Sequence, residues 1–294
     1  MISVIICSVN KQLANQIQQN IAETIGVDWQ AIIIDNSVNS SSITSVYNKC
    51  ASVAKYDILC FVHEDVLFKT QNWGRVLINT FSTDTELGLI GLAGSKYKSD
   101  IPSGWFSGNV AIDCCNITHL DKSNVSQVMH YNPDRTKQVQ EVVVLDGVLL
   151  VCPKKVWQEI KFDDQLLKGF HLYDIDFSFR VAEKYKVVVI YTISLIHLTQ
   201  GGSFGNEWLR YTLLWHEKMR SKLPVIAKDC TFCKKEVDSV IIKKWLIRLK
   251  HELIDTSNQI KWLIAIKIWT QVSAWPYVPL FLLKKYFKRY YKQV

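Results

Sequence analysis

The stretch "ILCFVHEDVLF" (58–68) places one imidazole and two carboxylates, those of His63, Glu64 and Asp65, inside an otherwise apolar run. Burying an unpaired carboxylate is costly, so such a cluster belongs at a strand end that faces a cleft, a metal or a partner. Carboxylate oxygens bind hard divalent cations, and imidazole suits borderline ones. The stretch therefore predicts a polar site at the end of a buried strand.

Two later segments carry further groups that are able to act as bases or ligands. "YDIDFSFR" (173–180) has Asp174 and Asp176 where a helix is expected to begin. A carboxylate at a helix start also serves as a cap, so each aspartate has both a catalytic and a structural interpretation. "LIHLTQGGSF" (195–204) has His197 after an apolar run, where a histidine is either a hydrogen-bonded core residue or a ligand.

The elements that would position these residues alternate between short β-branched runs and helical stretches. Strands are expected at 3–7, 29–37 and 57–66, and helices at 11–26 and 41–54. This order predicts an α/β fold, with a mostly parallel sheet flanked by helices on both faces. Ligands of such sheets bind beyond the carboxyl ends of the strands. Polar residues follow the three expected strands at those ends, which predicts a pocket there: Ser8, Asp35 and the group 63–65.

The rest of the first two-thirds is less regular. Residues 91–140 predict loops and antiparallel edge strands, because glycine and short polar breaks recur there. A strand is expected up to Val151, with Pro153 opening a helix. A further helix is expected from Tyr173 or Asp174, and two short strands lie within 186–198.

Charge divides the 294-residue chain into two parts. Residues 231–294 hold 13 Lys/Arg and 4 Asp/Glu, a net charge of +9, whereas the whole chain carries +8, so residues 1–230 are close to neutral. We therefore expect a domain at 1–230 and a helical basic extension at 231–294. Its mixture of aliphatic, tryptophan and lysine residues favours an interfacial helix on an anionic membrane over nucleic-acid binding. The alternative is that the tryptophans pack on the body and the lysines face water.

The location expected from these features is the cytoplasmic side of a membrane. Met1 leads directly into an apolar run without a basic n-region or a cleavage site, so no secretory signal is expected. The longest apolar stretch of the extension is interrupted by Lys267, Gln271 and two prolines, which makes it a poor membrane span. We expect a cytoplasmic protein that associates peripherally with the inner face of the cell membrane.

Residues 1–205 resemble a family 2 glycosyltransferase of the GT-A fold, closest to bacterial transferases of capsule and surface polysaccharide. The resemblance rests on motifs in the right order: "SVIICSVN", "AIIIDNS", "YNKCASVAKYDIL" and "FVHEDV" where "FLDADD" is usual. The helix motif keeps its asparagine but has Cys50 in place of a glycine. The resemblance implies that a nucleotide-sugar donor is bound by the following residues: Ser8, Asp35, Asn48, His63 and Glu64.

The same alignment implies a metal-dependent reaction. Asp65 matches the last, metal-binding aspartate, and His63 replaces the first one, so His63 is either a ligand better suited to Mn²⁺ than to Mg²⁺ or a contact to ribose or phosphate. His197 matches a further metal or diphosphate ligand, and Gly201 and Gly202 would let the following loop close over the pyrophosphate. Mn²⁺ or Mg²⁺ is the expected cofactor.

The acceptor-side motif "G-E-D-x-D-L-x-x-R" resembles "YDIDFSFR", with Tyr173 in place of an acidic residue. The resemblance implies that Asp174 takes the proton from the acceptor hydroxyl and that Asp176 supports it. It also implies an acceptor or sugar site formed by the following residues: Trp105, Asp146, Gly147, Tyr173 and Arg180. Asp146-Gly147 has a second interpretation as a simple strand turn, and Trp105 as a packing residue.

The function that follows is inverting transfer of a sugar from a UDP- or dTDP-sugar to a hydroxyl of a lipid-linked glycan in surface polysaccharide synthesis. Two alternatives remain. A catalytically inactive binding module is supported by the replacements at His63 and Tyr173. A nucleotidyltransferase would need a glycine-rich loop after the first strand, and "CSVNKQLANQ" has no glycine.

Overall fold

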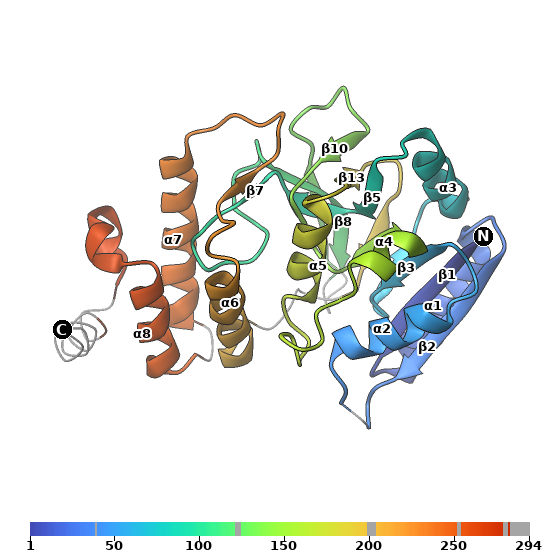
Figure 1. Cartoon of the computed structure of the whole chain (residues 1–294), viewed down its shortest axis with the longest axis horizontal. Helices are drawn as coiled ribbons and strands as arrows, with labels where there is room; N and C mark the ends of the chain where they lie inside the picture. Colours follow the sequence, from blue (N-terminus) through green and yellow to red (C-terminus); the bar gives the residue numbers. More distant parts are fainter. Residues whose placement is uncertain (39, 121–124, 199–203, 252–253, 279–281, 283–294) are drawn as a thin grey trace.

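The computed structural model describes residues 1–38, 40–120, 125–198, 204–251, 254–278 and 282. In Figure 1, a body of sheets flanked by helices contains the N-terminus. A helical part with α6, α7 and α8 lies on the opposite side of this body from the N-terminus. The predicted α/β class is confirmed.

A seven-stranded sheet forms the centre of the body. Strands β2, β1 and β3 run parallel, as do β5 and β13, while β12 is antiparallel to both of its neighbours and β10 to β13. The sheet is therefore mixed, with a parallel half that matches the expected β-α-β-α-β order. Its order across the sheet is β10 (Val139–Glu141), β13 (Lys186–Ile190), β5 (Leu87–Gly91), β12 (Leu149–Pro153), β3 (Ile58–Val62), β1 (Ile2–Ser8) and β2 (Trp29–Asp35).

Helices cover both faces of this sheet because the strands are apolar on both sides. Val4 and Ile6 of β1 pack in one cluster, whereas Ile5 packs in another on the opposite face. The first cluster includes side chains of α1 (Lys11–Thr24) and α3 (Trp73–Thr83). The second includes side chains of α2 (Ile43–Val53), α4 (Lys154–Glu159) and α5 (Tyr173–Ala182).

A second, six-stranded sheet meets the first at the predicted site. It contains β11 (Val144–Leu145), β6 (Ala93–Ser95), β8 (Asp113–Leu120), β14 (Leu195–His197) and β4 (Val66–Phe68), with β9 (Ser126–Tyr131) paired to β8. The expectation of one strand through residue 66 is wrong. β3 ends at Val62 in the first sheet and β4 begins at Val66 in the second, so residues 63–65 form the crossing between two sheets.

The C-terminal helices pack on the body through an apolar core of their own. α6 (Asn206–Lys218), α7 (Lys234–His251) and α8 (Thr256–Ala265) share one cluster with Phe179 of α5 and with Tyr97 of β7 (Tyr97–Lys98), which pairs with β15 (Val225–Ile226). Two 3₁₀ turns follow, Ile268–Thr270 and Val272–Tyr277. No helix within the described residues combines the length and apolar character needed to cross a membrane.

Two tryptophans expected on a membrane-facing surface are instead buried. Trp245 is 5% exposed and Trp262 is fully buried, with its indole N–H donating to the carbonyl of Pro102. Trp275, by contrast, is 38% exposed. The extension therefore uses part of its aromatic content to attach to the body.

Candidate active site

The crossing between the two sheets brings His63 and Asp65 beside His197. β4 pairs with β14, which sets His197 opposite Val66, the residue after Asp65. The backbone N–H of Leu198 donates to the carbonyl of Asp65 over 2.7 Å. Two segments far apart in the sequence are thereby fixed side by side, as the polar strand ends predicted.

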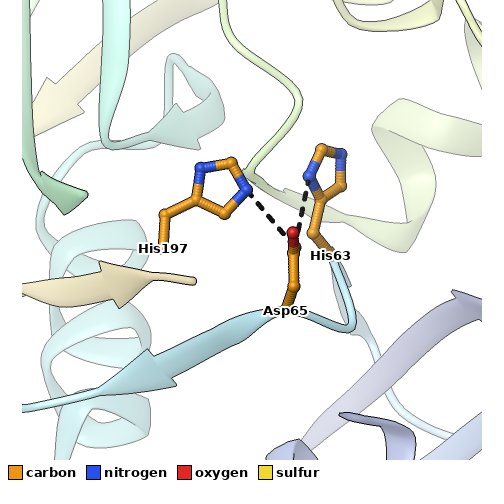
Figure 2. A group of neighbouring side chains, drawn as sticks. All are labelled: His63, Asp65 and His197. Carbon is orange, nitrogen blue, oxygen red and sulfur yellow. Dashed lines mark ion pairs between the residues drawn. The ribbon is translucent and has the colours of Figure 1, made fainter. Parts of the chain in front are cut away.

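Figure 2 shows the two imidazoles on either side of the Asp65 carboxylate, and we call these three residues the His–Asp–His cluster. Oδ1 of Asp65 lies 3.3 Å from Nε2 of His197 and 3.9 Å from Nδ1 of His63. Burial opposes ionisation of Asp65, but the hydrogen bond and charge of His197 and the charge of His63 outweigh burial and lower its pKa. Burial, followed by the charge of His197, lowers the pKa of His63, which favours a neutral imidazole.

The donor set of this cluster fits a divalent metal ion. One ligand atom from each of the three residues lies within 4.8 Å of the others. Ionised carboxylate and neutral imidazole are the forms that bind metal. Two nitrogens and one oxygen suit Mn²⁺ better than Mg²⁺, which prefers oxygen ligands throughout.

Tyr173 connects the cluster to the turn between β11 and β12. Its hydroxyl lies 2.7 Å from Nε2 of His63 and donates to the carbonyl of Gly147 over 3.1 Å. A Cβ at position 147 would collide with the Tyr173 hydroxyl, so only glycine fits this close approach. The predicted residues Tyr173 and Gly147 are thus brought to His63.

Asp174 lies at the same turn and is held in a state suited to proton transfer. Its Oδ2 accepts a hydrogen bond from the Gly147 N–H over 2.9 Å. Burial, reinforced by the charge of Asp146, raises the pKa of Asp174 to about 7. Leu172, the residue before α5, has φ 65°, a left-handed conformation that is costly for leucine. This strained turn sets the direction in which α5 begins.

Trp105 also reaches this turn. Its indole N–H donates to Oδ2 of Asp146 over 2.6 Å, and Oδ1 of Asp146 accepts from the Val148 N–H over 2.9 Å. The structure therefore brings five of the predicted acceptor-side and catalytic residues together: Trp105, Asp146, Gly147, Tyr173 and Asp174.

A cavity of about 440 Å³ opens beside the cluster. His63, Glu64 and Asp65 form one side of it, and Cys7 and Val9 line it from the end of β1. The remaining lining residues come from the 36–43 segment, the loop before α5 and the start of α6: Asn36, Ser40, Ser41, Ile43, Lys168, Gly169, Phe170 and Glu207.

The loop before α5 forms part of this wall, which no motif in the sequence indicated. Phe170 is 54% exposed, and its ring centroid lies 6.0 Å from that of His63. The loop is fixed to α2 by the hydroxyl of Thr44, which donates to the Leu167 carbonyl over 2.7 Å. The signal available in the sequence was an aromatic residue, Phe170, three positions before the expected helix start at Tyr173.

Glu64 and Ser8 hold the first loop in place at the cavity. The Glu64 carboxylate accepts hydrogen bonds from the Ser8 hydroxyl and from the backbone N–H groups of Val9 and Asn10. Asp35 is exposed at the end of β2 and is not among the lining residues. Its carboxylate accepts from the backbone and hydroxyl of Ser37, which lower its pKa.

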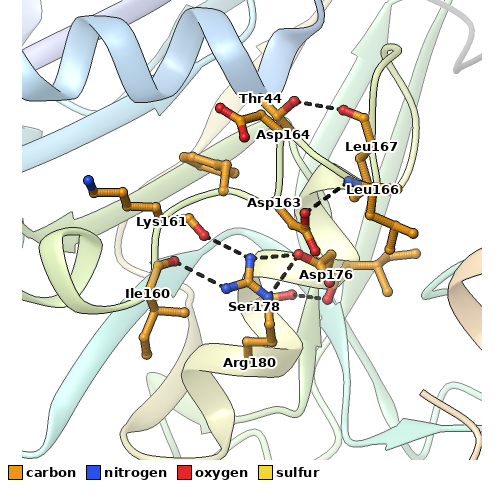
Figure 3. Close-up of polar contacts among 12 residues, drawn as sticks. Thr44, Ile160, Lys161, Asp163, Asp164, Leu166, Leu167, Asp176, Ser178 and Arg180 are labelled. Atoms are coloured by element: carbon orange, nitrogen blue, oxygen red, sulfur yellow. Dashed lines mark hydrogen bonds and ion pairs between the residues drawn. The ribbon is translucent and has the colours of Figure 1, made fainter. Parts of the chain in front are cut away.

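Asp176, Arg180 and Asn48 do not line the cavity, and their side chains bond to other groups of the protein. Figure 3 shows Arg180 between Asp176 and the carbonyls of Ile160 and Lys161. Asp176 is fully buried and accepts from Arg180 over 2.6 Å and from the Trp215 indole over 3.0 Å. We call this group of residues the Arg180 network.

Asn48 fastens the same loop from the α2 side. Its side chain donates to the Phe162 carbonyl over 2.9 Å and accepts from the Phe162 N–H and the Trp157 indole, each over 3.1 Å. Both the nitrogen and the oxygen of its side-chain amide are therefore engaged. The structure thus gives Asn48 a supporting position, while Gly201 and Gly202 lie outside the described residues.

Solved structures with the same arrangement of elements define the class of this fold. Staphylococcus aureus TarS, residues 1–349, matches with a TM-score of 0.52 at 11% identity, over 90% of this chain and 78% of that chain. GalNAc-T7, solved with UDP, GalNAc and Mn²⁺, matches with a TM-score of 0.51 at 11% identity, over 74% of this chain and 49% of that chain. The chain thus spans about half the length of GalNAc-T7. These neighbours are glycosyltransferases of the GT-A type, and the fold is theirs.

The sequence itself identifies the family. Residues 3–215 match the "Glycosyltransferase like family", which is most of the chain. A comparison with curated protein sequences finds no match. The chain belongs to this glycosyltransferase-like family, and the predicted family resemblance is confirmed at that level.

Proposed function

We propose that this protein transfers a sugar from a nucleotide-diphosphate donor, a UDP- or dTDP-sugar, to an acceptor hydroxyl with inversion at the anomeric carbon. The observation that carries the proposal is the His–Asp–His cluster beside a 440 Å³ cavity, joined through Tyr173 and Gly147 to a carboxylate with a raised pKa. Family membership supports the reaction class. The GalNAc-T7 neighbour, solved with UDP and Mn²⁺, supports the kind of donor and cofactor.

The residues on the two sides of the cluster have separate roles in this proposal. Asp65, His63 and His197 would hold Mn²⁺ or Mg²⁺, which neutralises the charge that grows on the leaving diphosphate. On the other side, Asp174 accepts the proton of the acceptor hydroxyl as that oxygen attacks the anomeric carbon. Asp146 and Trp105 shape the acceptor side, since their hydrogen bond fixes the indole next to this turn.

A base with a pKa near 7 suits this role at neutral pH. At that pKa about half of the Asp174 side chains are ionised at pH 7, and the group is a stronger base than an ordinary carboxylate. Its negative charge also favours an oxocarbenium-like transition state. The hydrogen bond from the Gly147 N–H to Oδ2 fixes the position of this carboxylate at the turn.

The test is a screen of nucleotide sugars for metal-dependent hydrolysis and transfer, together with calorimetry of UDP with and without Mn²⁺. We expect turnover for wild type with one donor class and a loss of about 10²–10⁴ in kcat for Asp174→Asn. Glu217→Gln, an exposed carboxylate on α6, is the matched control and should retain activity. Metal-dependent UDP binding without turnover of any donor would instead support an inactive binding module.

We further propose that the acceptor is a lipid-linked glycan of capsule or surface polysaccharide synthesis, used at the cytoplasmic face of the membrane. The basic extension supports this, since 13 of its residues are Lys or Arg. Lys261, Lys267 and Trp275 are exposed on it and are available to an anionic surface.

This second proposal is tested on the full chain, because the extension contributes to the core that covers α6. Lys261→Glu with Lys267→Glu should weaken flotation with phosphatidylglycerol vesicles by about tenfold or more, since each charge near the surface contributes about 1 kcal/mol. Lys49→Glu with Lys55→Glu, on the α2 side of the body, gives the same change of net charge as a control. Equal flotation of both variants and wild type would contradict a specific membrane surface.

A further inference from the structure

The hydrogen bonds around Tyr173 favour one of the two positions for the proton of a neutral His63. The Tyr173 hydroxyl has one proton, and the Gly147 carbonyl 3.1 Å away can only accept. The Tyr173 oxygen must then accept from its other close partner, Nε2 of His63 at 2.7 Å. The Tyr47 oxygen is a second acceptor for the same Tyr173 proton, so this contact also leaves the Tyr173 oxygen to accept from His63.

A neutral His63 protonated at Nε2 has its lone pair on Nδ1. That nitrogen lies 3.9 Å from Oδ1 of Asp65, too far for a hydrogen bond between them. Two acceptor atoms therefore face each other across a gap bordered also by Nε2 of His197, which lies 3.3 Å from the same oxygen. A cation between them would convert this arrangement of facing lone pairs into a set of metal ligands.

We propose that Tyr173 is a positioning residue that holds His63 as the Nε2–H tautomer, so that Nδ1 is available as a metal ligand. The proposal rests on the metal site of the proposed function. Gly147 is part of the device, because its carbonyl takes the tyrosine proton and its missing side chain leaves room for the hydroxyl. Metal-binding histidines are commonly oriented through the hydrogen bond of their second nitrogen, and losing such a partner weakens metal binding about 10–100-fold.

The packing of Tyr173 supports a fixed geometry. It is 3% exposed, and its ring lies 5.7 Å from that of Tyr47 in an edge-on contact and 6.2 Å from that of Phe162. The ring is thereby held by apolar neighbours, and the hydroxyl is left to make the directional contact. Removing the hydroxyl alone, with Tyr173→Phe, keeps this packing and isolates the hydrogen bond.

The experiment measures tautomer and metal affinity separately. Protein labelled with [¹⁵N]histidine gives the tautomer of His63 from long-range ¹H–¹⁵N spectra without metal, the signal being assigned by its loss in His63→Asn. Calorimetry with MnCl₂ alone gives the affinity. We expect Nε2–H in wild type, a shift toward Nδ1–H in Tyr173→Phe, and a Kd for Mn²⁺ about 10–100-fold weaker in that variant.

Tyr185→Phe is the matched control, since it removes a hydroxyl from a tyrosine that packs against the same core cluster and bonds to Glu159, not to Tyr173 or His63. It should bind Mn²⁺ within about twofold of wild type. An Nδ1–H tautomer in wild type, or an unchanged Mn²⁺ affinity in Tyr173→Phe, would overturn the proposal. If wild type binds no Mn²⁺, the metal site of the proposed function fails, whereas the metal-free spectrum still decides the role of Tyr173.

Discussion

The His–Asp–His cluster and the Arg180 network handle enclosed charge in opposite ways. In the cluster, Asp65 faces two imidazoles and a cavity, and no lysine or arginine pairs with it among the described ion pairs. In the network, Asp176 has an arginine and an indole N–H directed at its oxygens. A carboxylate with its charge fully paired stabilises structure, whereas one that faces imidazoles and open space is suited to a cation. The groups that surround each aspartate therefore indicate its role.

Asp174 and Asp176 lie on the same turn of α5 and should respond to substitution in opposite ways. Asp174→Asn should lower kcat by about 10²–10⁴, because it removes the base while keeping the shape of the side chain. It should not lower stability at alkaline pH, because the raised pKa means that the ionised form is disfavoured in the folded protein. Steady-state kinetics and thermal unfolding of the same preparation measure both effects. A variant with more than about a tenth of wild-type kcat would exclude Asp174 as the base.

Asp176→Asn should instead lower stability and leave kcat of the folded protein largely unchanged. The change leaves Arg180 in a largely enclosed position without its countercharge, and it weakens the bond to Trp215. Removing one partner of a buried ion pair costs about 3–5 kcal/mol, and because Arg180 is 21% exposed we expect about 2–4 kcal/mol. Urea unfolding gives the free energy, and activity is then measured at a temperature where the variant is folded. Near-wild-type stability with lost activity would move Asp176 into the site.

The sequence predicted the parts of the site that follow from strand order. Asp65 and His197 were both expected at strand ends, and pairing of β4 with β14 brings them together. The family resemblance pointed to Asp174 as the base with Asp176 supporting it, but local sequence patterns alone do not separate the two aspartates. Residues two apart on a helix point in widely different directions, so only the rotation of α5 decides which of them bonds to Gly147 beside Tyr173. That rotation depends on Leu172 and on long-range contacts of Arg180, which no local pattern encodes.

Local sequence patterns also did not predict the second sheet or the position of the loop before α5. The sequence predicts one apolar strand that includes Val62 and Val66. Pairing of Val62 with β12 and of Val66 with β14 places them in different sheets. Phe170 and Lys168 reach the cavity because Thr44 and Asn48 fasten their loop to α2. These are contacts between residues more than a hundred positions apart in the sequence.

Asn48 was expected to bind the nucleotide, but in the structure its side chain supports the loop before α5. Asn48→Ala should cost about 1–3 kcal/mol of unfolding free energy, since the Phe162 N–H and carbonyl lose their partners. UDP affinity measured by calorimetry should stay within about twofold of wild type. Asn79→Ala, at an exposed position of α3, provides the control for stability. A large loss of UDP affinity in folded Asn48→Ala would restore its predicted role.

The pH dependence of the reaction is the smallest expected effect and the most direct reading of the Asp174 environment. The base acts in its ionised form, so kcat at saturating Mn²⁺ should rise about tenfold between pH 6 and pH 8, through the pKa of about 7. Stability should change in the opposite direction, because a carboxyl group with a raised pKa binds its proton more tightly in the folded state and loses that advantage as pH rises.

Asp174→Asn should remove this component from both profiles, whereas Asp176→Asn should leave it in place. Because Asp146 contributes to the raised pKa, Asp146→Asn should shift the rise in kcat to lower pH. A rise that stays at the same pH in Asp146→Asn would show that another group controls it.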